Sequence, residues 1–252
     1  MPKLDDFWLD GECASDVGVV CQEFIEFEPV EPRVENIEVP GRSGDVVFWD
    51  GSYGNVKAHV KAYCLAREVA LVMARVNEWL LSKPGYRRLE TLHDPDHFRR
   101  ARVSKGAQIK ARLGLLNAFE IELDCDPRRF LKNGELELPI TYNDVLMNQT
   151  GFTARPLIKL VGHGKCAVRF GDVSVEDAPY LDLDSGATMT TAYIDVEEHE
   201  AYDASGNNLG NSLHGDLDLL QLPSGATRVQ YSVDNGTAGA TSCTIVPRWW
   251  TL

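Results

Sequence analysis

The stretch EVPGRSGDVVFWDGSYGNVKAHVKAYC, from Glu38 to Cys64, contains the pattern that decides the fold of the first half of the chain. Its first part places glycines and other turn-forming residues around aromatic residues. Its second part, Val56 to Cys64, is apolar at every second position, which is the period of a half-buried β-strand. Glycine-rich segments can cradle a phosphate, close a hairpin or offer backbone to another protein, so these glycines need an interpretation.

The glycines do not fit a phosphate-binding loop. Neither PGRSGD nor DGSYGN carries the GK[ST] ending that handles phosphates and magnesium, and no helix is expected directly after either segment. We therefore interpret the glycine pairs as two tight turns that bracket a short strand, Asp45–Trp49.

Further strands and one helix are expected in the first half. An apolar stripe at helical spacing runs from Leu65 to Leu80, and Ser82–Gly85 ends it. HDPDHF, from His93 to Phe98, holds two histidines four residues apart, but its proline favours a turn over a metal-binding helix. The remaining expected strands are Val19–Glu28, Glu35–Pro40, Arg87–Leu92 and Asn117–Asp126.

The second half has a different composition. Residues 141–252 contain only six Lys and Arg, and short alternating runs are separated by turn signals such as DSG (Asp184–Gly186), LPSG and DNG. Many short strands with such turns are typical of an antiparallel sandwich. We expect a first domain at residues 1–140 and a second at 141–252, with Trp249 and Trp250 buried in the second domain or back against the first.

Composition and charge exclude several classes of protein. No apolar run approaches the ~18 residues of a membrane span, and the acidic start lacks the apolar core of a signal peptide. Six widely spaced cysteines, with no CxxC, indicate small buried residues in a reducing compartment. The net charge of −13 argues against binding of a phosphate backbone as the main role. We also expect no sequence-specific binding of nucleic acid.

No motif indicates catalysis. The chain lacks GxSxG, and no histidine accompanies a cysteine at a catalytic spacing. We predict a protein that is not an enzyme, with no catalytic, cofactor-binding or metal-binding residues and no cofactor.

Charge and aromatic residues indicate contacts between copies instead. Residues 1–50 hold 13 acids against 3 bases, and residues 83–132 hold 12 bases against 7 acids. Such asymmetry can orient head-to-tail contacts. The candidate contact residues between subunits are Trp49, Tyr53, Arg99, Arg100 and Arg102.

The opening stretch also carries a family resemblance. VPGRSGDVVFWDGSYGNV (Val39–Val56) resembles the N-terminal hallmark of siphophage distal tail proteins, the Dit family. HDPDHFRRARV, DCDPRRFL, NQTGFTARPLIKLVGHG, LDSGATMTTAYID, NSLHGDLDLLQLPSGATRVQYS and the final IVPRWW are similar to that family in the same order, so the resemblance covers nearly the whole chain.

The resemblance implies a mainly β protein with a structural role. It implies an N-terminal tail-tube-like β domain with one α-helix, followed by a C-terminal galectin-like antiparallel β-sandwich. It further implies a homohexameric ring, possibly stacked, at the distal tail tip of the virion, assembled in the bacterial host cytoplasm. The implied partners are the tail tube protein, a tail-associated tip protein and a receptor-binding or baseplate protein, with DNA passing through the lumen.

A carbohydrate-binding module is the alternative function. Residues 141–248 contain no tryptophan on which a sugar could stack, and the histidines and arginines of this region do not group as in galectins. Any sugar would then bind through a surface unlike that of a galectin.

Overall fold

A computed structural model describes residues 6–65, 68–183 and 189–252. The chain divides into two compact units, residues 1–129 with Leu252 and residues 130–251, and each is described here by itself. The sequence had placed this boundary near residue 140. The turn expected at Asp184–Gly186 lies outside the described residues.

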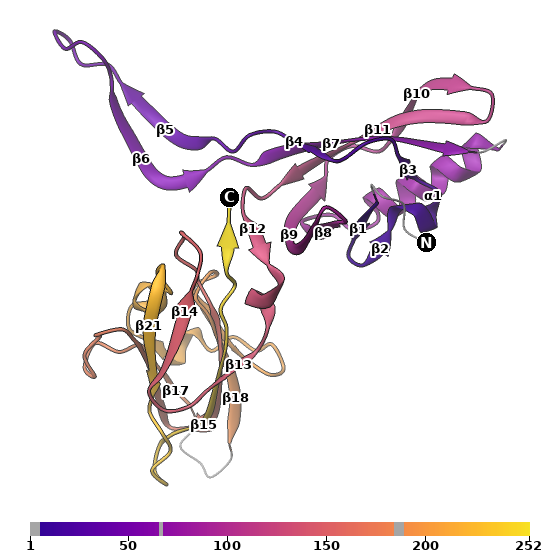
Figure 1. Cartoon of the computed structure of the whole chain (residues 1–252). Helices are drawn as coiled ribbons and strands as arrows, with labels where there is room; N and C mark the ends of the chain where they lie inside the picture. Colours follow the sequence, from indigo (N-terminus) through magenta and orange to yellow (C-terminus); the bar gives the residue numbers. More distant parts are fainter. Residues whose placement is uncertain (1–5, 66–67, 184–188) are drawn as a thin grey trace. The chain divides into compact units, whose positions relative to one another are not determined.

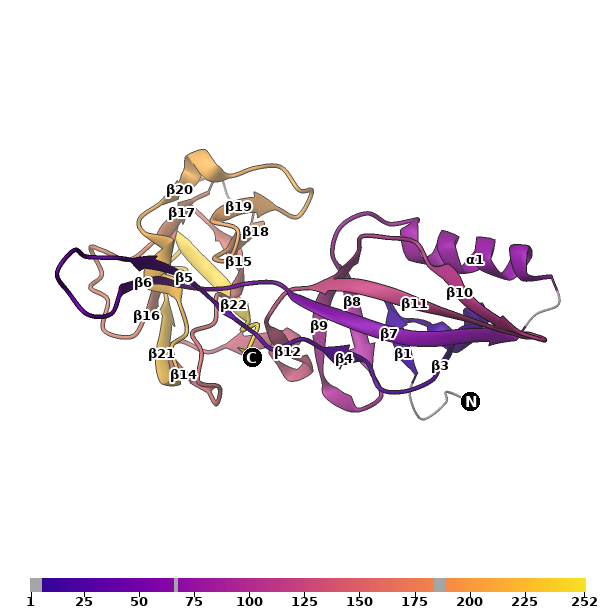
Figure 2. The same ribbon diagram turned by 90° about the horizontal axis from the view of Figure 1, so that it is seen from above.

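The first unit is built on one large antiparallel sheet (Figures 1 and 2). Its strands run in the order β2 (Glu12–Cys13), β1 (Phe7–Leu9), β8 (Arg87–Thr91), β9 (Asp94–Val103), β11 (Leu116–Cys125), β7 (Val56–Leu65) and β3 (Val20–Cys21). In addition, β10 (Gln108–Leu113) pairs with β11, β4 (Glu26–Phe27) pairs with β7, and the short 3-10 helix η1 (Ala14–Val17) follows β2. The longest pairing joins β7 to β11 without a break, from Val56 opposite Cys125 to Leu65 opposite Leu116.

The core of this unit lies between one face of that sheet and the helix α1 (Val69–Leu81). The predicted alternation of β7 is confirmed, because its residues are buried and exposed or half-buried in turn along the whole strand. Trp79 of α1 is buried, and its ring centroid lies 5.7 Å from that of Phe7. The predicted start of the helix was wrong: Leu65 is the last residue of β7 and is 65% exposed.

Two other local predictions were wrong in extent. The turn expected at HDPDHF covers only Leu92 and His93, because β9 begins at Asp94 and continues the sheet through the proline. The strand expected at Val19–Glu28 is reduced to the two-residue strands β3 and β4, which meet β7 at separate points.

A separate two-stranded sheet includes the middle of the stretch Glu38–Cys64. Among the described residues, β5 (Pro32–Ile37) pairs only with β6 (Val46–Tyr53), and we call residues 32–53 the arm. The expected short strand Asp45–Trp49 is longer than predicted, since β6 continues through Gly51 to Tyr53. Gly51 has a φ of 86° where the register shifts between Pro32 and Val34, so this glycine permits a β-bulge within the strand.

The second unit is an antiparallel β-sandwich. One five-stranded sheet has the order β13 (Leu138–Ile140), β22 (Gly239–Val246), β15 (Leu157–His163), β18 (Thr190–Asp195) and β19 (Glu200–Asp203). The other has the order β14 (Asp144–Asn148), β21 (Gly225–Tyr231), β16 (Lys165–Phe170), β17 (Tyr180–Asp182) and β20 (Leu213–His214). The strands β12 (Arg129–Leu131) and β23 (Trp250–Thr251) pair with each other, and three 3-10 helices complete the unit: η2 (Lys132–Glu135), η3 (Gly210–Ser212) and η4 (Leu217–Leu220).

The terminal aromatic pair packs within this second unit. Trp249 is buried in the sandwich core, and Trp250 stacks on Phe152 with ring centroids 4.4 Å apart. The neighbouring Arg248 forms a two-point ion pair with the buried carboxylate of Asp195, at 2.7 Å for each oxygen. Of the two burial sites left open for the tryptophans, the second unit is therefore the one occupied.

The six cysteines are free thiols, and five of them are buried. Burial raises the pKa of Cys125 and of Cys243 to about 12. These thiols therefore act as small core residues. Among the described residues α1 is the only α-helix, and it is neither long nor apolar enough to cross a membrane.

Candidate functional site

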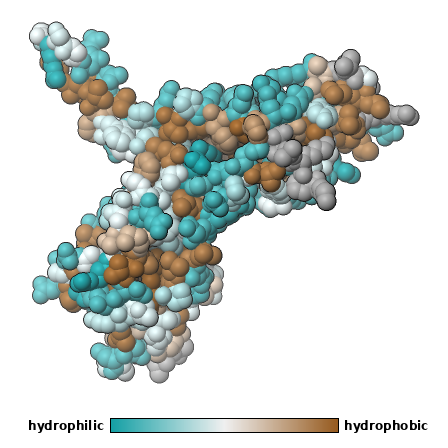
Figure 3. All heavy atoms as spheres, in the orientation of Figure 1, coloured by the Kyte–Doolittle hydropathy of each residue, from teal (hydrophilic) through white to brown (hydrophobic). Residues whose placement is uncertain are grey.

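The arm exposes the largest concentration of apolar side chains in the first unit. Val34, Ile37, Val39, Val47, Phe48 and Trp49 are each between 41% and 60% exposed. Hydrophobic residues also appear on the arm in the surface view (Figure 3). An isolated two-stranded hairpin is marginally stable in water at best. The arm is therefore a candidate interaction surface.

The register shows that the arm is apolar on both faces. Directly opposed residues of an antiparallel pair lie on the same face, and successive residues alternate between faces. The opposed pairs are Ile37–Val46, Asn36–Val47, Glu35–Phe48 and Val34–Trp49. One face thus carries Ile37, Val46 and Phe48, and the other carries Val34, Val47 and Trp49. A strand pair of this composition is typical of ribbons that are covered on both sides.

Two of the candidate contact residues, Trp49 and Tyr53, come together on the arm. Their rings meet edge to face with centroids 5.5 Å apart, and the Trp49 indole N–H donates to the Ser52 carbonyl at 2.8 Å. The Ser52 backbone N–H donates to the Asp50 carboxylate at 2.8 Å, and hydrogen bonding by Ser52 lowers the pKa of Asp50. The bulge thus holds the Trp49 ring in place before any partner binds, which lowers the entropy cost of binding.

The three candidate arginines lie on β9, in a different sheet from Trp49 and Tyr53. The Arg99 guanidinium donates to the Pro127 carbonyl at 2.8 Å and lies 4.8 Å from the Phe27 ring centroid. Burial lowers the pKa of Arg99. Arg102 pairs with Asp124 at 2.6 Å, and Arg100 lies opposite Arg88 of β8. Arg99 and Arg102 therefore already hold contacts inside the chain.

The polar face of β7 and β11 is compensated in charge. Lys57 pairs with Glu122 at 3.9 Å, and Lys61 pairs with Glu23 at 2.6 Å. His59 lies between two carboxylates, 3.2 Å from Glu120 and 3.5 Å from Glu28. The hydrogen bond from Lys110 lowers the pKa of Glu120. On this face the basic side chains of β7 lie beside acidic side chains of β11, so neither sign of charge forms a patch of its own.

The histidines of HDPDHF form no metal cluster in the described part of the chain, where no group of three or more His, Cys, Asp or Glu is placed to hold a metal ion. His97 Nδ1 lies 2.7 Å from Asp94 Oδ1, and Arg129 donates to Asp94 Oδ2 at 2.6 Å. Both oxygens of Asp94 are thus engaged. Burial alone would raise the pKa of Asp94, but hydrogen bonds and charge from Arg129 and His97 lower it.

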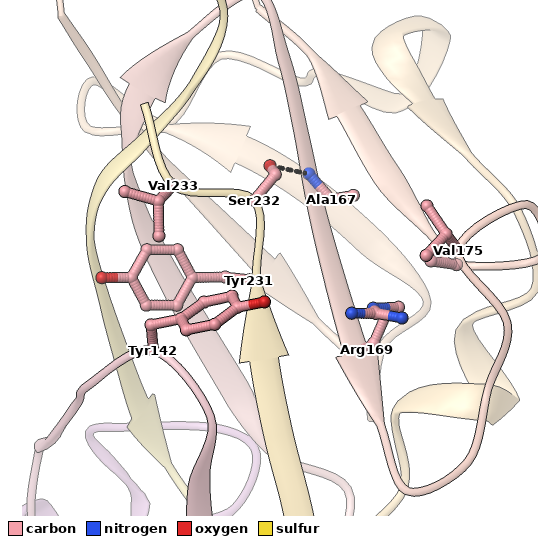
Figure 4. A pocket seen from close by; sticks show the side chains of 8 residues that line it. Tyr142, Ala167, Arg169, Val175, Tyr231, Ser232 and Val233 are labelled. Carbon is pink, nitrogen blue, oxygen red and sulfur yellow. Dashed lines mark hydrogen bonds between the residues drawn. The ribbon is translucent and has the colours of Figure 1, made fainter. Parts of the chain in front are cut away.

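A pocket in the second unit was missed by the sequence analysis. It has a volume of about 460 Å³ and is lined by residues that include Tyr142, Arg169 and Tyr231 (Figure 4). One signal in the sequence could have pointed to it, the outward position of Arg169 in the alternating run KCAVRF. The two tyrosines beside it come from segments far away in sequence, so the pocket itself left no local pattern.

Comparisons with known proteins identify the fold. No protein-family model matches the sequence, and a search of curated proteins gives no match. Among solved structures, the chain is similar to the Dit protein (gp 19.1) of phage SPP1, described as a paradigm of the hub adsorption apparatus of phages that infect Gram-positive bacteria. The TM-score is 0.71 at 15% identity, over 99% of this chain and 100% of that one.

A second solved structure is more distant. A chain of the phage p2 baseplate, in its activated conformation with strontium, matches with a TM-score of 0.51 at 10% identity, over 95% of this chain and 97% of that one. At these identities the likeness shows the fold. The chain therefore has a Dit-like β fold, as the resemblance in its sequence implied.

Proposed function

We propose that this chain is a structural, non-enzymatic hub protein of a siphophage tail. The likeness to SPP1 Dit over both units carries the proposal, since that protein is described as a hub of an adsorption apparatus. In this proposal the chain forms a homohexameric ring at the distal end of the tail, after assembly in the host cytoplasm. The ring joins the tail tube to a tip protein and to a receptor-binding or baseplate protein.

The arm is the element that we propose for contact between copies. Both of its faces are apolar and exposed in the single chain, and burying such surface is the main favourable term in association. A contact between an arm and a different surface on the next copy is heterologous, and heterologous contacts close into a ring when the rotation allows.

Charge complementarity supports a specific receiving surface. Residues 28–50, which include the arm, hold six acids and two bases, whereas residues 87–105 on β8 and β9 hold six bases and three acids. An apolar recess of about 340 Å³ borders β9, and Phe24, Phe27 and His93 line it. We propose that the arm of one copy docks beside β9 of the next, where Arg99, Arg100 and Arg102 remain the candidate contacts. Raised ionic strength should then weaken assembly.

The polar face of β7 and β11 is our candidate for the lumen. Strong binding of DNA depends on many basic side chains that neutralise phosphates. On this face Lys57 and Lys61 are each paired with a glutamate, so few cations are available to a passing polyanion. Such a surface suits the transit of DNA without retention.

The test is the native mass of the purified full chain, measured by light scattering at high protein concentration and low salt, with negative-stain images of the same fraction. We expect six copies, or twelve for stacked rings, and ring-shaped particles. A strict monomer under these conditions would contradict self-assembly as a property of the chain itself.

A further inference from the structure

The pocket at Tyr142, Arg169 and Tyr231 lies at the sheet β14-β21-β16-β17-β20 of the second unit. In β16 the buried residues Cys166, Val168 and Phe170 alternate with Lys165, Ala167 and Arg169, which are exposed or half-buried. Arg169 is therefore on the outer face, in register with Gln230 of β21. The volume of the pocket, about 460 Å³, is within the range of small-molecule sites.

Arg169 has no side-chain partner among the described residues, although acids outnumber bases in its unit. Residues 130–251 contain 16 acids and only 7 bases. Other bases of this unit are engaged: Arg155 with Asp218, Lys159 with Glu137, and Arg248 with Asp195. A half-buried guanidinium carries five N–H donors and is a strong binder of carboxylate and phosphate. An unpaired one in a pocket is thus a candidate anion-binding group.

A second cation shares this outer face. Arg228 of β21 is exposed, lies two residues from Gln230 and has no ion-pair partner in the part of the chain that the structure describes. Residues two apart on a strand point to the same side, so Arg228 and Arg169 occupy neighbouring positions on adjacent strands. Two uncompensated arginines in an acidic unit create a local positive field.

The rest of the pocket is built for the body of a ligand. Ala167 and Ala178 contribute only small side chains, and Val175 adds apolar surface. Figure 4 shows the rings of Tyr142 and Tyr231 close to each other, with Arg169 across the pocket from them. Tyrosine offers a flat apolar ring with a hydroxyl at one end, which suits a ligand that has both C–H and O–H groups.

We propose that this pocket binds a saccharide unit that carries a phosphate or a carboxylate group. Arg169 receives the anionic group, the tyrosine rings pack against the C–H face of the sugar, and Arg228 adds attraction at the rim. A neutral sugar leaves Arg169 unpaired, and a bare anion leaves the rings uncovered. The same chemistry is present in a free sugar phosphate and in the repeating unit of an anionic surface polymer.

The test is calorimetric titration of the full chain with four probes at constant ionic strength: glucose 6-phosphate, glucose, inorganic phosphate and the peptide triglutamate. We expect saturable binding of glucose 6-phosphate, with affinity at least about tenfold above that for each other probe, as loss of a charge-assisted hydrogen bond predicts. A polymer of phosphate-linked sugars that binds more tightly than the monomer would identify a surface polymer as the source, and equal affinity per unit would identify the free sugar phosphate.

Two variants and a control locate the site. Arg169→Gln should weaken binding of glucose 6-phosphate about tenfold or more, and Ala167→Leu should obstruct the pocket from the strand beneath it. Arg155→Gln, which removes a paired arginine of the same unit, should leave binding unchanged. The proposal is wrong if Arg169→Gln binds like the unaltered chain, if no probe saturates, or if inorganic phosphate or triglutamate binds as tightly as glucose 6-phosphate.

Discussion

The arm and the β7–β11 pair are both long antiparallel strand pairs of the first unit, yet they bury their apolar residues differently. In β11 every second residue is buried, and the other face is polar and charge-paired. In the arm both faces carry apolar residues, and the exposed fraction of Phe48 reaches 60%. The first pair completes its burial within the chain. The second leaves apolar residues of both faces exposed in the single chain.

The largest expected effect comes from removing the apolar residues of the arm. We predict that Phe48→Ser with Trp49→Ser abolishes assembly, because central aromatic contacts of an interface typically contribute about 2 kcal/mol or more each. Light scattering would give the mass of one chain. The melting temperature should stay unchanged, because both residues lie outside the cores.

The matched control replaces exposed apolar residues of the second unit. Leu136→Ser with Val145→Ser changes side chains of 59% and 55% exposure that belong to neither face of the arm. This variant should assemble like the unaltered chain. Equal loss of assembly in both variants would remove the special role of the arm.

The next largest effect concerns the β7–β11 strand pair, whose apolar residues are buried within the chain. Ile121→Ala in β11 should lower the free energy of unfolding by about 2–5 kcal/mol, because Ile121 is fully buried and its truncation leaves a cavity. Phe48→Ala on the arm should change the stability of the monomer by less than about 0.5 kcal/mol, as for surface positions. Urea denaturation of both variants, at concentrations where the chain is monomeric, measures the contrast. A comparable loss for Phe48→Ala would mean that the arm is buried within its own chain.

A smaller effect depends on pH and tests how much the buried Asp195–Arg248 ion pair stabilises the second unit. Hydrogen bonding and the charge of Arg248 lower the pKa of Asp195 in the fold despite the opposing effect of burial. The stabilisation is therefore fully present above the unfolded pKa, about 4, and is lost as the pH falls through the folded value. We expect Asp195→Asn to flatten the loss of stability below about pH 4 in urea denaturation. An acid dependence as steep as that of the unaltered chain would contradict this role.

The smallest effect should come from the polar face of β7. Lys61→Ala removes an exposed ion pair with Glu23, and exposed pairs typically contribute about 0–1 kcal/mol. The unfolding free energy should change by less than about 0.5 kcal/mol. A loss of several kcal/mol would show that the charge-paired face stabilises the monomer as the buried face does.

Strict alternation made part of this fold predictable. Val56–Cys64 and the run around Ile121 reveal both the strands and their buried faces, because one side of each completes the core. The end of β6 was not predictable in the same way, since Gly51 reads as a turn and the structure uses it as a bulge. The start of α1 was missed because Leu65 fits the apolar stripe of the helix as well as the end of β7.

The Trp49–Tyr53 pair and the Arg169 pocket also differ in how far they could be predicted from the sequence. Trp49 and Tyr53 could be selected from sequence because only three residues separate them, and one bulge brings their rings together. Arg169 could not be joined to Tyr142 and Tyr231 from sequence, because antiparallel pairing of distant strands creates that neighbourhood. Local patterns predict local sites, whereas a pocket lined by two strands and the loops beside them requires the register of the sheet.

The open edges of the arm have a consequence for the newly synthesised chain. A ribbon with unpaired backbone N–H and C=O groups along its sides can template misfolded aggregates as readily as correct ones. Glu35 lies directly opposite Phe48, and Glu38, Asp45 and Asp50 follow on the same hairpin. Charged residues at such positions oppose edge-to-edge pairing of like strands. If the arm docks as proposed, the same carboxylates would disfavour arm-to-arm contacts and favour a basic surface.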